Sequence, residues 1–88
     1  MNEALNRFVY EMDVYCDNNG IEYRYHRDIF QNGFTFRFTR HLSNGDTKMI
    51  NIFLDDIHFY PTSLSPYVRV TKMIEKHLFN EVKNERTV

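Results

Sequence analysis

The chain is poor in the residues that most often mark a stapled fold or a cofactor loop. It has 88 residues, with one cysteine, no tryptophan, three glycines and two prolines. The single Cys16 excludes an internal disulfide, which is typical of a reducing cytosol or of a small fold that needs no covalent staple. The three glycines are isolated from one another. Their spacing argues against a glycine-rich phosphate-binding loop.

The chain also lacks long apolar runs and a strong net charge. No apolar stretch approaches the ~20 residues of a membrane helix, and no charged-then-apolar leader opens the sequence. We therefore expect a soluble, cytoplasmic protein. The net charge of −1 is typical neither of a nucleic-acid mimic nor of a strongly basic binder. Its distribution is uneven, because residues 1–20 are mainly acidic and residues 66–88 mainly basic.

Aromatic residues are what the chain has in abundance. Eight phenylalanines and six tyrosines, in a sequence that is 42% hydrophobic, predict a folded core rather than disorder. A chain of this length has room for one core only. We expect one small globular domain over residues 1–88.

One hairpin has a register that can be read from the sequence. Two runs of alternating apolar and polar residues, 34–39 and 50–54, flank the turn sequence Ser43-Asn44-Gly45. A two-residue loop would set Phe38 against Asn51, apolar against polar, and would do the same on the other face. A three-residue loop with Gly45 in the left-handed conformation sets apolar residues against each other. The pairs that it predicts are Phe38–Ile50, Phe36–Ile52 and Phe34–Leu54. This register gives one wholly apolar sheet face, and we adopt it.

Helices are expected at both ends of the chain. The first begins after Asn2, a suitable N-cap, and ends at Asn19-Gly20, the residue types that close helices in a left-handed turn. Its apolar stripe recurs at helical spacing: Leu5, Phe8, Val9, Met12, Tyr15 and Cys16. The second begins at Ser65-Pro66, with serine as N-cap and proline in the first turn. Its stripe is Tyr67, Val70, Ile74, Leu78 and Val82.

The middle of the chain predicts the sheet. Residues 21–26 alternate as a half-buried strand, and a looser connection follows in which Ile29 and Phe30 either extend the strand or close the end of the core. Ile57–Tyr60 is either a short fourth strand or an ordered aromatic loop, since Pro61 disfavours a central strand there. We therefore predict an α+β, two-layer α-β-β-β-α fold. An antiparallel meander of three or four strands has both helices on its apolar face and water on the other.

The water-facing side of that sheet is the main candidate site. It presents hydrogen-bond donors and positive charge beside two apolar residues, and apolar residues on an exposed face favour contact with a partner. The candidate partner-binding residues are Arg24, His26, Thr35, Arg37, Thr39, Asn51, Phe53 and Met49. A solvated antiparallel face has the same composition, so both interpretations stay open. A secondary candidate surface is formed by His58, Phe59 and Tyr60. The basic stripe of Arg69, Lys72, Lys76 and Lys83 is typical of a solvated helix face.

Metal binding and catalysis have little support in the sequence. His26 and His41 share a sheet face, but they lie four to six residues of strand apart, roughly 13–20 Å, too far to bind one ion. Cys16 belongs to a buried stripe. Ser63 and Ser65 are explained as helix-start residues, and no nucleophile elbow accompanies them. We expect no metal, no cofactor and no enzymatic activity.

Two families share the predicted order of elements. The order α-β-β-β-α resembles the double-stranded-RNA-binding fold, in which a basic cluster at the start of the last helix grips phosphates. The matching segment here is Ser65-Pro66-Tyr67-Val68-Arg69, with one basic residue. The order also resembles the core of restriction-endonuclease-like enzymes, and Asp46-Thr47-Lys48 with the upstream Asp28 has their spacing. Asp46, however, closes a tight turn, where aspartate is explained by local hydrogen bonding.

These observations favour a small non-enzymatic protein that acts by binding another protein, of an inhibitor or adaptor type. Compact regulatory domains of this kind are common in phage and mobile elements. One alternative is a nucleic-acid-binding module that uses the same basic face, and another is a minor metal-dependent nuclease. A homodimer is also expected, because Phe59 and Tyr60 follow an outer strand whose backbone is unpaired.

Overall fold

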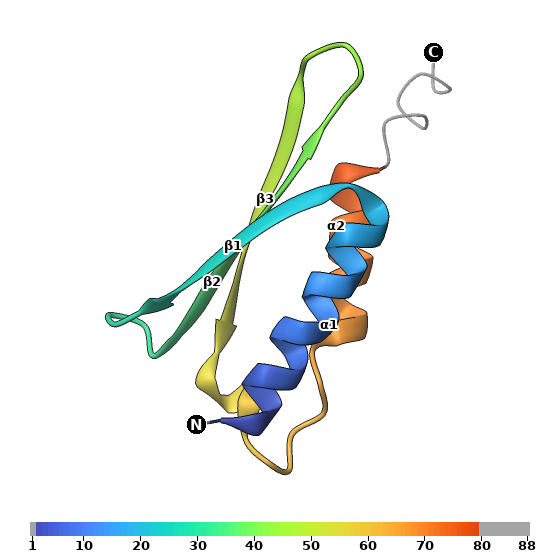
Figure 1. Ribbon diagram of the computed structural model, residues 1–88. Helices are drawn as coiled ribbons and strands as arrows, with labels where there is room; N and C mark the ends of the chain where they lie inside the picture. Colours follow the sequence, from blue (N-terminus) through green and yellow to red (C-terminus); the bar gives the residue numbers. More distant parts are fainter. Residues whose placement is uncertain (1, 80–88) are drawn as a thin grey trace.

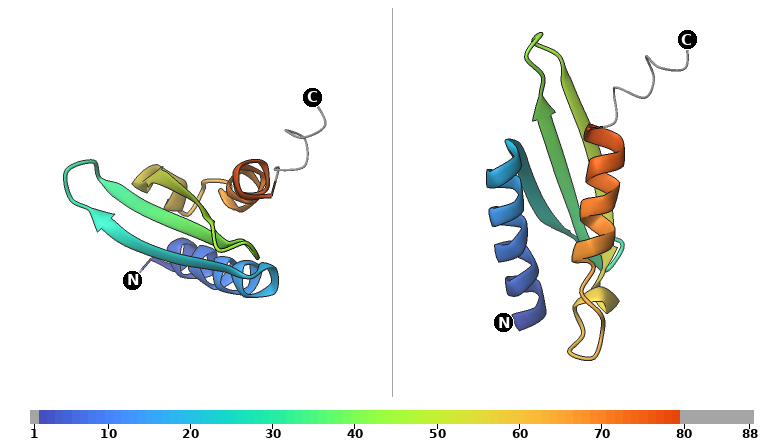
Figure 2. Two further views of the ribbon diagram at one scale, coloured as in Figure 1. Left: turned by 90° about the horizontal axis from the view of Figure 1, so that it is seen from above. Right: turned by 90° about the vertical axis from the view of Figure 1, so that its right-hand side faces the viewer.

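The protein is a two-layer α+β structure, described over residues 2–79 of a computed structural model (Figure 1). The elements, in chain order, are α1 (Glu3–Asn19), β1 (Ile21–Asp28), β2 (Gly33–His41), β3 (Thr47–Asp55), the 3-10 helix η1 (Asp56–Phe59) and α2 (Tyr67–Leu78). The strands form one antiparallel sheet in the order β1-β2-β3. Both helices cover one face of the sheet, α1 along β1 and α2 along β3 (Figure 2). The predicted fold class is confirmed.

The caps of α1 follow the sequence prediction. Asn2 is the N-cap, and its side-chain oxygen accepts a hydrogen bond from the Leu5 backbone N–H at 3.0 Å. Gly20 closes the helix in the left-handed conformation, with φ of 67°, which glycine adopts without steric cost. The Asn2 amide also donates to the carbonyl of Phe59 at 3.0 Å. The start of α1 is thereby fixed to η1.

The register of the β2–β3 hairpin is the one predicted for a three-residue loop. Phe38 pairs with Ile50, Phe36 with Ile52 and Phe34 with Leu54. In the loop, the Leu42 N–H donates to the Asp46 carbonyl at 2.8 Å, and the Gly45 N–H donates to the Leu42 carbonyl at 3.0 Å. Gly45 has a positive φ of 96°, as this turn requires.

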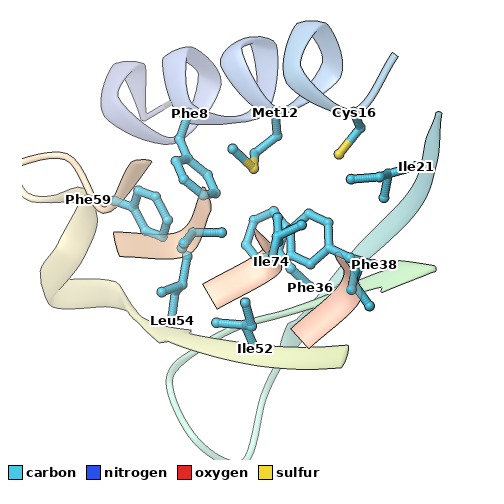
Figure 3. Close-up of a cluster of buried hydrophobic side chains, with 12 residues drawn as sticks. Phe8, Met12, Cys16, Ile21, Phe36, Phe38, Ile52, Leu54, Phe59 and Ile74 are labelled. Carbon is cyan, nitrogen blue, oxygen red and sulfur yellow. The ribbon is translucent and has the colours of Figure 1, made fainter. Parts of the chain in front are cut away.

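The core lies between the inner face of the sheet and the two helices (Figure 3). Phe8 of α1 meets Phe36 of β2 edge to face, with ring centroids 5.2 Å apart, and touches Phe59 at 5.7 Å. The buried residues come from every element: Phe8, Met12, Cys16, Ile21, Phe36, Phe38, Ile52, Leu54, Phe59, Val70, Ile74 and Leu78. They include every described residue of the α2 stripe except the half-buried Tyr67, whereas Val82 lies outside the described residues.

Polar side chains at the rim of the inner face hold the two layers together. Arg27 makes a bidentate ion pair with Asp56, at 2.6 and 3.0 Å. The Arg40 guanidinium lies 4.2 Å from the ring centroid of Phe79 and donates to the carbonyl of Leu78 at 2.7 Å. A cation at the carboxyl end of a helix is favourable. Arg40 therefore attaches the last turn of α2 to the central strand.

Three local expectations are wrong or need refinement. Residues 56–59 form η1 rather than a fourth strand, because the Asp55 carboxylate caps them by accepting from the Ile57 N–H. Ile29 and Phe30 are exposed at the β1–β2 turn and neither extend the strand nor close the core. Helix α2 begins at Tyr67, one residue later than predicted, although the Ser65 hydroxyl does accept from the Tyr67 N–H at 3.2 Å.

Candidate functional site

All eight predicted partner-binding residues lie on the outer face of the sheet, opposite the core. The alternation of side chains along each strand carries them there, because their sequence neighbours Tyr23, Phe36, Phe38, Ile50 and Ile52 face the helices. The registers align them into cross-strand rows. His26 pairs with Thr35 and that residue with Phe53, while Thr39 pairs with Met49. The central row runs Arg24–Arg37–Asn51.

Two arginines sit side by side at the centre of this face. Arg24 of β1 pairs directly with Arg37 of β2, so their Cβ atoms are separated by about 4.5–5.5 Å. The Arg37 Nε donates to the Asn51 side-chain oxygen at 3.2 Å. Within residues 2–79 neither guanidinium has a carboxylate partner. Like charges directly opposite on adjacent strands are destabilising, so this pair is a local electrostatic cost that an anionic group would offset.

A shallow depression surrounds the arginine pair. Its lining residues are Arg24, Tyr25, His26, Thr35, Arg37 and Asn51. The side chains that line it provide hydrogen-bond donors from guanidinium, imidazole and amide groups. Tyr25 adds an aromatic wall, since its ring stacks on Phe36 at 5.1 Å while the residue stays 43% exposed. The composition suits a carboxylate or phosphate group, which accepts several hydrogen bonds at once.

Two apolar residues flank the polar centre on β3. Met49 is 54% exposed and Phe53 36% exposed. The Phe53 ring occupies the space above Gly33, where an added Cβ would lie 2.5 Å from the ring and 2.5 Å from the Leu54 carbonyl oxygen. Glycine at position 33 thus allows Phe53 to lie flat on the sheet. These residues supply the apolar contact area that protein interfaces combine with arginine.

One acidic residue on this face was not singled out from the sequence. Glu22 contacts His41, with 3.2 Å between the Glu22 carboxylate and His41 Nε2. Its place in the β1 alternation already put it on the outer face, but its proximity to His41 depended on the register of the first hairpin. Glu22 marks the acidic end of the face, away from the depression around Arg24.

The secondary candidate surface of His58, Phe59 and Tyr60 is only partly exposed. Phe59 is 2% exposed and belongs to the core, so it cannot contact a partner, and expecting an exposed ring there was wrong. His58 is half-buried and lies 3.2 Å from an Arg69 guanidinium nitrogen. Tyr60 is exposed. The structure instead exposes Phe30, at 91%, on the tip of the β1–β2 turn.

The residues considered for metal binding or catalysis remain apart. His26 pairs with Thr35, six residues before His41 on β2, which is about 20 Å of strand. Asp28 lies at the β1–β2 turn and Asp46 at the β2–β3 turn, separated by the nine residues of β2, roughly 25–30 Å. Across the described part of the chain, no three His, Cys, Asp or Glu side chains are grouped so as to hold a metal ion. Burial raises the pKa of the Cys16 thiol to about 12.

No protein family, curated protein or solved structure matches this chain. Neither α1 nor α2, the helices found within residues 2–79, combines the length and apolarity needed to cross a membrane.

Proposed function

We propose that this protein is a small non-enzymatic regulator, of an inhibitor or adaptor type, that acts in the cytoplasm by docking the outer face of its sheet on an acidic surface of another protein. The observation that carries the proposal is the directly opposed pair Arg24–Arg37, which lacks a carboxylate partner among the described residues. A carboxylate from a partner would supply the missing charge and accept charge-assisted hydrogen bonds from both guanidiniums.

The surroundings of the pair support a protein partner. Met49 and Phe53 add exposed apolar area beside the arginines, and interfaces of proteins concentrate binding energy in central arginine and aromatic residues. Arg37 lies on the middle strand, between Arg24 and Asn51, so a docked partner would remove it from water. Truncating such a central arginine typically costs about 2 kcal/mol or more of binding free energy.

The test is a pull-down from the source cell with three baits. The wild-type protein is compared with Arg37→Glu and with Lys72→Glu, a matched charge reversal on the exposed surface of α2. We expect wild type and Lys72→Glu to capture the same protein, with or without nuclease treatment. Arg37→Glu should keep the wild-type melting temperature and bind at least tenfold more weakly, a loss of about 1.4 kcal/mol.

Two results would overturn the proposal. Equal capture by a folded Arg37→Glu protein would move the binding site off the outer face. Loss of capture on nuclease treatment would favour the nucleic-acid-binding alternative, in which Arg24, His26 and Arg37 share contacts to phosphates. In that case the logarithm of the affinity should fall linearly with the logarithm of the salt concentration.

A further inference from the structure

The two edges of the sheet differ sharply in charge. Strand β1 carries four charged side chains along its length, two acidic and two basic. Strand β3 reads TKMINIFLD, with no charged residue between Lys48 and Asp55. Edge strands of monomeric proteins are protected by charges, prolines or bulges. Between Met49 and Leu54, β3 has none of these, and its register with β2 is continuous.

The hydrogen bonds of the hairpin loop fix which backbone groups of β3 point to the open edge. The Leu42 N–H donates to the Asp46 carbonyl, so this pair is hydrogen-bonded, and bonded and non-bonded pairs alternate along an antiparallel ladder. The inner-face residues of β3 therefore bond toward β2. The backbone N–H and C=O groups of Met49, Asn51 and Phe53 point away from the sheet, where another strand could accept them.

We propose that a second copy of this chain pairs antiparallel with the β3 edge, about a two-fold axis at Asn51, to form a continuous six-stranded sheet. In this register Met49 of one copy lies opposite Phe53 of the other on the outer face, and Ile50 lies opposite Ile52 on the inner face. Apolar residues thus meet on both faces. An interface of this kind is isologous, because the same edge serves both copies.

The neighbouring registers are worse. A slip of one residue sets the outer face of one copy against the inner face of the other. A slip of two residues in one direction pairs Met49 with Asn51 and Phe53 with Thr47. A slip of two in the other direction pairs Met49 with Asp55 and Phe53 with Asn51. Only the axis at Asn51 brings the exposed apolar residues together.

Charge complementarity also favours a second copy. The loop end of β3 carries Lys48, and its other end carries Asp55 followed by Asp56. An antiparallel partner strand places the basic end of one copy beside the acidic end of the other, once at each end of the shared ladder. The strand is therefore complementary to itself in hydrogen bonding, apolar contact and charge.

The pairing would extend the site described above, and this part rests on the proposed function. The central row of each copy, Arg24–Arg37–Asn51, would continue across the axis into the Asn51–Arg37–Arg24 row of the other. Four arginines would then lie in one line across the outer face, spanning about 24 Å at the spacing of paired strands. An acidic partner would be bound at two equivalent points.

Cysteine cross-linking tests the register. In a Cys16→Ala background, we expect Asn51→Cys to form a covalent dimer on mild oxidation, because the two positions face each other within disulfide range. Met49→Cys alone should not, since Met49 lies far from its own counterpart. A mixture of the Met49→Cys and Phe53→Cys chains should cross-link. Cross-linking of Met49→Cys alone, or no cross-linking of Asn51→Cys, would overturn the register.

A charge-swap experiment tests the interface without cysteines. Sedimentation at high micromolar concentration should give a wild-type dimer, and Met49→Glu or Phe53→Lys alone should be monomeric. Mixing these two variants should restore a dimer, since Glu at 49 then faces Lys at 53. Thr39→Glu, on β2 beside Met49, is the matched control and should stay dimeric. A monomeric wild-type protein, or no rescue in the mixture, would refute the dimer.

Failure of the dimer and failure of the proposed function give different results. The dimer does not use Arg37, so Arg37→Glu should sediment as wild type does even if it captures no partner. A monomeric wild-type protein whose capture still depends on Arg37 would refute the dimer and leave the docking face in place.

Discussion

The two faces of the sheet are made from the same three strands yet have opposite physical roles. The inner face carries Phe36, Phe38, Ile52 and Leu54, all buried beneath the helices. The outer face carries an opposed arginine pair, threonines and two exposed apolar residues. Alternation along the strand produces both surfaces at once, so stability and recognition are separated by a single residue step. Changes on one face should therefore leave the other nearly intact.

The sharpest contrast is between neighbouring positions 35 and 36. Phe36→Ala should lower the free energy of unfolding by about 3–5 kcal/mol, because it removes a fully buried ring from the centre of the core. Thr35→Ala, one residue away on the outer face, should change it by less than about 0.5 kcal/mol. Urea denaturation of both variants measures the difference. Comparable losses in the two would mean that the faces are not independent.

Gly33→Ala tests the one place where the outer face is closely packed. The new Cβ would lie 2.5 Å from the Leu54 carbonyl oxygen and 2.5 Å from the Phe53 ring, and overpacking of this kind typically costs about 1–3 kcal/mol. The ring can turn away, but the backbone carbonyl cannot. Adding Phe53→Ala should therefore not restore the stability lost, as measured by thermal unfolding. Full recovery in the double variant would show that the ring is the sole obstacle.

Tyr23→Phe should have the smallest effect, at the margin between the layers. The Tyr23 hydroxyl donates to the Val9 carbonyl at 3.1 Å and to the Asp13 carboxylate, and losing such bonds costs about 1 kcal/mol. Burial, with help from the Asp13 carboxylate, raises the pKa of Tyr23. Its contribution is therefore complete below about pH 10 and is lost as the pH rises toward the folded-state pKa.

The stability difference between wild type and Tyr23→Phe should accordingly shrink on going from neutral to strongly alkaline solution. Chemical denaturation at about pH 7 and about pH 11 measures it, because those values lie on either side of an ordinary tyrosine pKa. A difference that is the same at both values would contradict a hydroxyl held protonated between α1 and β1. Tyr10→Phe, at an exposed position of α1, is the control.

Most of the fold could be predicted from periodicity and turn chemistry. The β2–β3 register followed from matching Phe36 with Ile52, and the ends of α1 followed from Asn2 and Gly20. The outer-face residues followed in turn, since alternation fixes the second face once the first is known. These elements are determined by local pattern, and local pattern is what a sequence displays directly.

The failures lie where tertiary contacts decide. Residues 57–60 have the apolar and aromatic composition of a strand, but the Asp55 cap and the burial of Phe59 against Phe8 select a 3-10 turn. Ile29 and Phe30 appeared suited to the core, yet the Asp28 carboxylate, by accepting from the Phe30 N–H, shapes a turn that leaves them exposed. The absence of a carboxylate partner for Arg24 and Arg37 among the described residues could be established only from three-dimensional distances.

The placement of α2 over β3 has a consequence for how the chain is made. Ile52 and Leu54 are covered by a helix that begins only at Tyr67 and ends at Leu78. At a synthesis rate of about 5–20 residues per second, the segment from Leu54 to Leu78 takes roughly 1–5 s to emerge. Throughout that interval the nascent sheet has its apolar side half uncovered. Each newly made chain therefore passes through a brief period in which chaperones, or other nascent chains, compete with its own last helix for the same surface.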